Sequence, residues 1–203
     1  MFTALGLLTM AVAVGAQAPA PRKVGPSAIP VEPEPQHGLA FANELVRVFD
    51  LRLPPGSKRL SHQHLHGTVI VTIVPRRGGP GRAAFAGDAT FAAGGHSQVL
   101  ANAGTGEQRF VEVEILTPGR PAARAVAGEP DHVLEIENDS VRIYRVRLDP
   151  GDSIPVHTHS AAWLAVTIAG APGPGAHRWY DAGDANPLTA GQYRLEMVEV
   201  EPK

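Results

Sequence analysis

Residues 41–73, FANELVRVFDLRLPPGSKRLSHQHLHGTVIVTI, align without a gap to residues 136–168, IENDSVRIYRVRLDPGDSIPVHTHSAAWLAVTI. Twelve of the 33 aligned positions are identical, and all of them lie at the same offset of 95 residues. Self-similarity at a fixed offset is the signature of a duplicated structural unit. The sequence therefore predicts two copies of one small domain.

Each copy begins with a segment whose apolar residues alternate, as a half-buried β-strand requires. In the first copy Val46 and Val48 share one face, and Phe49, Leu51 and Leu53 share the other. The second copy changes face at the matching point. We expect a β-bulge or a bend there, of the kind that curls a sheet into a barrel.

Turns and further strands follow in both copies, and convincing helical periodicity is absent after the amino-terminal segment. Each Pro-Gly pair favours a turn, and the apolar runs are short enough for buried strands. These elements are the turns at 55–56 and 150–151, the buried strands at 69–74 and 164–168, and the closing strands at 109–116 and 194–200.

The amino terminus has the features of an export signal. Residues 2–15 are nearly all apolar or small. The small residues of Val14-Gly15-Ala16 follow at the end of this run and suit signal-peptide cleavage after Ala16. This run of about 14 residues is shorter than the roughly 20 that span a bilayer, so we expect a periplasmic or secreted mature protein without a membrane span. We divide the chain into a signal peptide (1–16), a Pro-rich linker (17–36), a first domain (37–118), a second linker (119–130) and a second domain (131–203).

Composition excludes several classes of partner and ligand. The chain has 203 residues, a formal net charge of −2 and no cysteine. No block of like charges is present to attract nucleic acid, and any metal must be bound by nitrogen and oxygen ligands. Each unit has only about 75 to 80 residues, so its isolated core is marginal, and we expect the two units to pack on each other or to form a homodimer.

A His-x-His pair follows the Pro-Gly turn in each copy. Alternate residues of a strand point the same way, so His62 and His64 present two imidazoles to one side, about 6.5 to 7 Å apart along the backbone. Both rings can tilt toward a single metal ion, and His157 with His159 can do the same. His66 continues the alternation in the first copy, where the second copy has Ala161.

These residues resemble the first motif of the cupin superfamily, which runs Gly, five residues, His-x-His, three or four residues, Glu. Gly56 with the first pair and Gly151 with the second reproduce the opening spacing. The resemblance covers most of residues 41–116 and 136–201. It implies an all-β bicupin: two tandem small jelly-roll β-barrels, each with a ligand pocket, in which the His pair, the Glu and a later His bind one divalent metal.

The chain departs from that pattern in both copies. The expected Glu is replaced by Thr68 or Val69 in the first copy, and by Trp163 or Leu164 in the second. Gln98 occupies the slot of the later His in the first copy, with His96 two positions earlier. The matching region of the second copy, residues 179–186, has no histidine, and His177 precedes it.

The first unit is therefore the better candidate for a metal site. Its ligands are expected to be His62 and His64 together with His66, His96 or Gln98, as against a remnant pocket in which the imidazoles only form hydrogen bonds. The second unit is expected to be the weaker site, with His157 and His159 beside a pocket residue, Trp163, that places apolar bulk where the Glu is missing. Zn, Fe, Mn, Ni and Cu all suit such donors.

Other charged residues on the strands are expected to lie on solvated faces, with binding of a carboxylate substrate as the alternative for the recurring arginines. They are Arg47, Arg52, Arg142, Arg147, Glu112 and Glu114. Three functions follow from these observations: a metal-dependent cupin enzyme acting on a small molecule, a noncatalytic exported protein that binds a metal or small ligand, and a structural pair of barrels. Fold resemblance alone does not establish catalysis.

Overall fold

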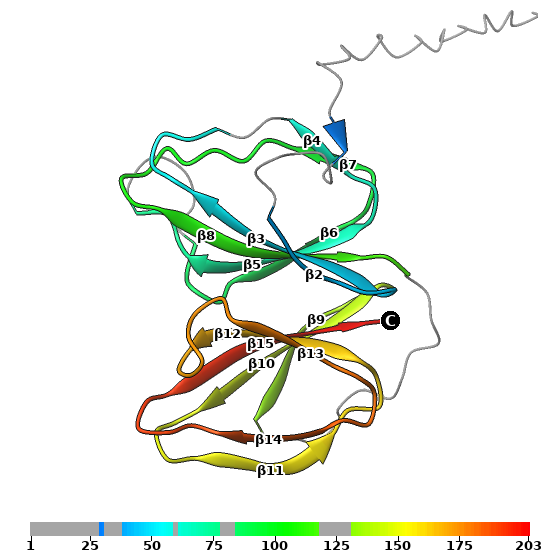
Figure 1. Cartoon of the computed structure of the whole chain (residues 1–203), viewed down its shortest axis with the longest axis vertical. Coiled ribbons are helices and arrows are strands. Elements are labelled where there is room, and N and C mark those ends of the chain that lie inside the picture. Colours follow the sequence, from blue (N-terminus) through cyan, green and yellow to red (C-terminus); the bar gives the residue numbers. More distant parts are fainter. Residues whose placement is uncertain (1–28, 31–37, 59–60, 78–83, 118–130) are drawn as a thin grey trace, which may run out of the picture.

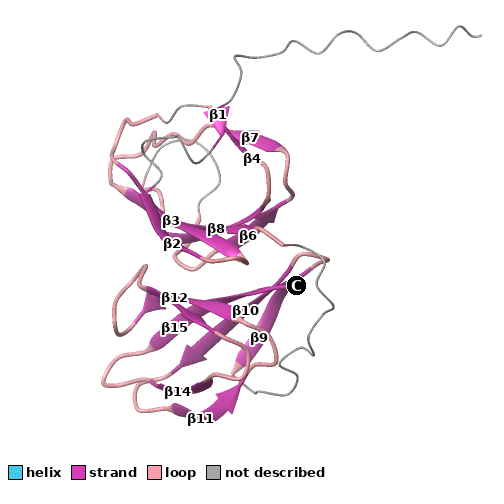
Figure 2. Ribbon diagram, turned by 45° about the vertical axis from the view of Figure 1, so that its right-hand side comes forward, coloured by secondary structure: helices cyan, strands magenta, loops and turns pink. Residues whose placement is uncertain are grey.

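The computed structural model describes residues 29–30, 38–58, 61–77, 84–117 and 131–203. The regular secondary structure of these residues consists of β-strands alone, as Figure 2 shows. None of these residues forms a helix that could cross a membrane. The expected signal peptide, most of the first linker and the second linker lie outside the described residues.

Two similar sets of strands follow one another along the chain. The first set is β1 (Ile29–Pro30), β2 (Gly38–Ala42), β3 (Val46–Leu53), β4 (His62–His64), β5 (Gly67–Val74), β6 (Ala89–Ala92), β7 (His96–Gln98) and β8 (Gln108–Ile115). The second set is β9 (His132–Glu137), β10 (Val141–Leu148), β11 (Ser153–Thr158), β12 (Trp163–Ala169), β13 (His177–Tyr180), β14 (Ala185–Thr189) and β15 (Leu195–Pro202).

Each set forms a barrel from one large and one small sheet. The large sheets have the matching orders β2-β3-β8-β5-β6 and β9-β10-β15-β12-β13. The small sheet of the first barrel contains β1, β4 and β7, and that of the second contains β11 and β14. The lumen of each barrel is the space between its two sheets. The all-β, tandem-barrel architecture expected from the sequence is confirmed.

The two large sheets pack against each other at the centre of the molecule, and the small sheets lie at its two ends (Figure 1). One apolar cluster joins the two barrels. Val48, Val71 and Val113 contribute to it from the first barrel, and Ile143 and Val198 from the second. These β-branched side chains are almost free of solvent, and their burial provides the main hydrophobic contribution to the contact between barrels. The chain thus packs its two marginal cores on each other.

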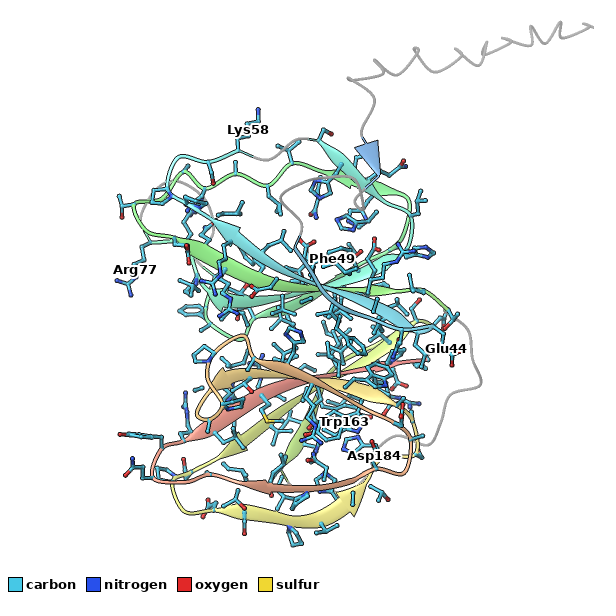
Figure 3. All side chains as sticks on the ribbon, in the orientation of Figure 1. Glu44, Phe49, Lys58, Arg77, Trp163 and Asp184 are labelled. Atoms are coloured by element: carbon cyan, nitrogen blue, oxygen red, sulfur yellow. The ribbon has the colours of Figure 1, made fainter. Side chains whose placement is uncertain are left out.

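Strand β3 is buried on both faces, which corrects the expected bulge within it. Val46 and Val48 face the other barrel, whereas Phe49 and Leu51 face the lumen, where Figure 3 shows Phe49. The pairing of β3 with β8 is regular from Val46 to Leu53. The irregularity lies instead in the edge strands: the register shifts between β2 and β3 and, at the matching point, between β9 and β10.

The Pro-Gly turns are confirmed, and their glycines are required by the backbone. Gly56 has φ of +73° and Gly151 has φ of +88°, a region that other residues rarely adopt. A Cβ atom at either position would meet nothing within 4 Å. The conformation of the chain, and not lack of space, therefore favours glycine before each His-x-His strand.

Candidate metal centres in the two barrels

The histidine pair of the first barrel points into its lumen and is already engaged by a glutamine. His62 and His64, on β4, are completely buried, and β7 places Gln98 directly opposite His62. The Gln98 amide nitrogen lies 3.2 Å from His62 Nε2, 2.7 Å from His64 Nε2 and 3.3 Å from an oxygen of Glu112. Two imidazoles, one carboxylate and one side-chain amide therefore converge on a single point.

Two carboxylates on β8 complete this centre, which corrects the expectation that they are solvated. Glu112 and Glu114 are completely buried. Val111, Val113 and Ile115 alternate with them and enter the core between the barrels, so the pleat of β8 turns both acids into the lumen. Glu114 lies 3.0 Å from His64 Nδ1, a carboxylate–histidine contact of the kind that orients a metal ligand.

The two other histidines expected near this centre are placed differently. The strand ends at His64, so His66 lies in the bend after it, and the expected alternation does not continue to it. His96 pairs with His64 across β4 and β7, and the two rings stack with centroids 5.0 Å apart. Its Nδ1 lies 2.8 Å from the carbonyl oxygen of Ala93. His96 thus packs beside the histidine pair with one nitrogen already used.

The second barrel brings three imidazoles together. His157 is on β11, His159 follows that strand, and His132 comes from β9 of the large sheet. Each offers a nitrogen, and these three atoms lie within 4.8 Å of one another. Glu199 of β15 joins them, with a carboxylate oxygen 3.4 Å from His132 Nε2 and 3.9 Å from His159 Nε2. The centre thus contains three nitrogen donors and one carboxylate.

Most polar atoms of the second centre lack a hydrogen-bond partner among the described residues. They are both ring nitrogens of His132 and of His159, Nε2 of His157 and both carboxylate oxygens of Glu199. Leaving several buried polar atoms unsatisfied is costly, because each has lost its hydration without gaining a hydrogen bond. A divalent cation would bind one nitrogen of each imidazole together with a carboxylate oxygen of Glu199, and a donor set of nitrogen and oxygen suits the divalent transition metals. The residues therefore fit a metal.

Burial keeps His159 in the state that a metal ligand needs. Removal from water, with the nearby His132 and His157 as smaller contributions, lowers the pKa of His159 to about 3. The imidazole is therefore neutral at physiological pH, and one of its nitrogens has a lone pair available for a cation.

An aromatic stack covers one side of the second centre. Trp163 is completely buried inside the second barrel, where Figure 3 labels it. The centroid of its ring lies 4.4 Å from that of His159. It lies 4.3 Å from the ring centroid of Tyr180, which is on β13. The tryptophan that replaces the expected Glu thus packs against a candidate ligand and fills the lumen beside it.

The strand arginines divide into two groups. Arg52 and Arg147 have exposed side chains, as expected, whereas Arg142 is buried, which corrects its expected solvated position. Arg142 lies 2.7 Å from Glu201 of β15 and 2.9 Å from Glu137. The matching Arg47 contacts Glu114 at 3.5 Å. These ion pairs link neighbouring strands in both barrels, which explains why the arginines recur in the repeat.

Sequence reasoning missed His132, Glu112 and Glu199 as members of the centres. A signal for His132 was available, because His37 precedes it by the same offset of 95 residues, just before the aligned segment. His37 lies outside the described residues. The glutamates carried no comparable signal. Both faces of their strands are buried, and alternation alone does not tell which face points into the lumen.

The chain matches no protein-family model and no curated protein sequence. Among solved structures it is similar to a putative glyoxylate-induced protein from Pseudomonas aeruginosa, with a TM-score of 0.55, 14% identity and coverage of 81% of this chain and 77% of that one. It is also similar to a salicylate 1,2-dioxygenase from Pseudaminobacter salicylatoxidans, with a TM-score of 0.53, 11% identity and coverage of 84% and 78%.

A third match is a cupin domain from Bordetella pertussis, which has 23% identity and a TM-score of 0.36, and covers 45% of this chain and 98% of its own. The two longer likenesses, together with the topology of the sheets, show that the chain has the cupin fold twice in tandem.

Proposed function

We propose that this protein is an exported bicupin whose second barrel binds a divalent metal through His132, His157, His159 and Glu199. The observation that carries the proposal is the convergence of three imidazole nitrogens within 4.8 Å of one another, at a place where most of their polar atoms lack hydrogen-bond partners. The first barrel, with His62, His64, Glu112 and Gln98, is the weaker metal site in this proposal.

This order of the two sites differs from the order expected from the sequence. In the first barrel the amide nitrogen of Gln98 already contacts both imidazoles, so a metal has to displace it. In the second barrel the corresponding Asn186 lies opposite His157, but the nitrogen of its shorter amide has no hydrogen-bond partner among the described residues. A cation there displaces no protein hydrogen bond from the ligands.

A small molecule is proposed as the second ligand of this barrel. When bound, a divalent metal supplies Lewis-acid activation of an oxygen on such a molecule. The protein's own residues hold the ligand nitrogens in place: Trp163 packs on the ring of His159, and the carbonyl oxygen of Pro155 lies 3.1 Å from Nδ1 of His157, which leaves Nε2 of His157 free to face the centre.

A noncatalytic binding role is the second candidate, and the packing of Trp163 favours it. A completely buried indole against His159 restricts the space in which a substrate could reach the centre. Water-proton relaxation of the Mn²⁺-loaded protein separates the two functions. Fast exchange of bound water indicates open coordination positions, as catalysis requires, whereas little enhancement indicates a closed binding site.

Metal analysis of the purified full chain tests the proposal. The protein is incubated with Zn²⁺, Mn²⁺ or Fe²⁺, freed of excess ion and measured by mass spectrometry. We expect the His157→Ala/His159→Ala variant to lose the tightly bound equivalent and the His62→Ala/His64→Ala variant to retain it. No bound metal in the unaltered protein would overturn the proposal.

Export is tested separately. Expression of the full gene product, fractionation of the cells and amino-terminal sequencing of the mature chain should find it outside the cytoplasm and beginning after Ala16. A cytoplasmic chain that retains Met1 would contradict this part of the proposal and leave the metal centre unaffected.

A further inference from the structure

The second barrel contains a cavity of about 260 Å³ beside its metal centre. The cavity lies between β12, β13, β14 and β15, at the end of the lumen away from Glu201. Its walls combine aliphatic side chains with polar ones. The aliphatic residues include Ala165, Pro172, Leu188, Leu195 and Met197, and the polar ones include Thr167, Thr189 and Arg178. None of the candidate metal ligands is among its lining residues.

Two aromatic side chains stand between this cavity and the metal centre. Tyr180 lines the cavity, Trp163 stacks on Tyr180, and His159 stacks on Trp163. The pleat of β12 turns Trp163 and Ala165 to the same side, so the cavity continues the lumen beyond the indole. The barrel is thus divided into one compartment with the imidazoles and a second, partly aliphatic compartment with the cavity.

The charge at the cavity is positive. Arg178 and His177 are the ionisable basic residues that line it, and no aspartate or glutamate is among the described lining residues. Arg178 and Tyr180 alternate on β13, and the guanidinium carbon of Arg178 lies 4.8 Å from the centroid of the Tyr180 ring. No ion pair to Arg178 occurs within the described part of the chain. Its charge is therefore available to an anion at the mouth of the cavity.

The shape of the cavity favours an aliphatic ligand over an aromatic one. The Tyr180 ring is already engaged, because Trp163 stacks on it at 4.3 Å and Arg178 lies over it. A ligand therefore meets alkyl groups and not an open aromatic face. Pockets for drug-sized ligands measure roughly 300 to 1,000 Å³, so a cavity of about 260 Å³ suits a short chain.

The first barrel holds one wall of this cavity in place. Arg109 of β8 donates a hydrogen bond of 2.7 Å to the carbonyl oxygen of Pro174, in the loop that also contributes Ala171, Pro172 and Ala176 to the lining. The same guanidinium forms two hydrogen bonds to Asp50, which lower the pKa of that carboxyl. The contact between barrels thus shapes a binding cavity in addition to burying apolar surface.

From these observations we infer that the second barrel binds a short-chain aliphatic monocarboxylate, with its alkyl chain in the cavity and its carboxylate at Arg178. The inference goes beyond the proposed metal site, because it concerns a second ligand site of the same barrel that Trp163 and Tyr180 separate from the imidazoles, and it requires no bound metal. A charge-assisted hydrogen bond from Arg178 would fix the orientation of the ligand, and burial of the alkyl chain would supply most of the affinity.

Calorimetric titration of the chelator-treated full chain with hexanoate, and with its neutral isostere hexanamide, tests this inference. We expect hexanoate to bind with one-to-one stoichiometry at millimolar or lower concentration. Arg178→Gln should weaken hexanoate binding about tenfold and leave hexanamide binding unchanged. The control is Arg52→Gln, which removes an exposed arginine of the other barrel and should change neither. Equal hexanoate affinity in Arg178→Gln, or no binding to the unaltered chain, would overturn the inference.

A second variant tests the position of the alkyl chain. Ala165→Leu fills the cavity from its β12 wall and should abolish the binding of both ligands in a chain that still unfolds cooperatively. If this substitution destabilises the fold, Thr189→Leu, which fills the cavity from the exposed edge of its β14 wall, supplies the same test and should weaken the binding of both ligands. Retained hexanoate binding in a folded Ala165→Leu chain would contradict the inference.

The test also separates this inference from the metal proposal. Hexanoate binding should persist in the His157→Ala/His159→Ala variant, because neither histidine lines the cavity. Absence of metal with retained hexanoate binding would therefore contradict the metal proposal alone. Metal binding without hexanoate binding would contradict only the inference about the cavity.

Discussion

The two barrels carry the same His-x-His pair but surround it differently. In the first barrel an amide, Gln98, contacts both imidazoles, and His64 has a second contact with Glu114. In the second barrel Asn186, one methylene shorter, makes no such contact, and Glu201 is paired with Arg142 instead of with His159. The repeated motif therefore fixes where the imidazoles lie, and its neighbours decide how many of their nitrogens remain available.

The stacking partner differs between the barrels as well. His64 stacks on His96, whereas His159 stacks on Trp163. The aligned residue of Trp163 in the first barrel is Thr68, a much smaller side chain. The second barrel thus replaces hydrogen-bonded contacts around its pair with apolar bulk, which leaves both nitrogens of His159 and Nε2 of His157 without hydrogen bonds to the described residues.

Removal of the third imidazole should produce the largest difference between the barrels. His132→Ala deletes a donor that has no described counterpart in the first barrel, so we expect metal affinity at the second barrel to fall about 100-fold or more. Competition with a fluorescent chelator measures the change. His177→Ala, in the same domain but outside the triad, is the matched control, and an equal loss in both variants would contradict the assignment.

Truncation of the indole should be the most damaging change for stability. Trp163→Ala opens a large cavity in a fully packed lumen, so we expect the free energy of unfolding to fall by about 3 to 5 kcal/mol. Thr68→Ala, at the aligned position, should cost only about 1 kcal/mol. Urea denaturation of the metal-free chains compares them. Equal costs would show that the two lumens are packed alike.

The two barrels could be predicted from the sequence, whereas the residues that form the two candidate metal centres could be predicted only in part. The repeat, the Pro-Gly turns and the alternation around Val46 are local patterns, and they predicted the strands and the duplication. Placing Glu112 and Glu199 required knowing that the two large sheets pack on each other, which turns the valines of β8 and β15 outward and the acids inward. Likewise, whether Gln98 or Asn186 reaches an imidazole depends on distances across two strands, which no sequence period encodes.

Exchange of the two amides should reduce the difference in metal affinity between the barrels, with a smaller effect than removal of His132. Asn186→Gln extends an amide toward His157 and His159, and we expect it to weaken metal binding at the second barrel about tenfold. Gln98→Asn should strengthen binding at the first barrel by a similar factor. Titration of each variant by calorimetry, in a chain whose other histidine pair is replaced by alanine, isolates the two sites. Unchanged affinities would show that the amides do not compete with the metal.

Near neutral pH the smallest expected effect is that of the His159 charge on stability, which grows only as the pH falls. The folded state lowers the pKa of His159 from 6.5 to about 3, so the unfolded state binds the proton more readily between these values. Stability from this group is present above pH 6.5 and is lost as the pH falls toward 3, by at most about 1.4 kcal/mol per pH unit. Urea denaturation of metal-free protein at several pH values, compared with His159→Gln, measures this contribution, which the variant should lack.

Anomalous diffraction from crystals of the full chain, grown with substoichiometric Zn²⁺, tests the central claim most directly. The account predicts a single strong anomalous peak among His132, His157, His159 and Glu199, with a weaker peak or none beside Gln98. A dominant peak at His62 and His64, or no peak within either lumen, would contradict it.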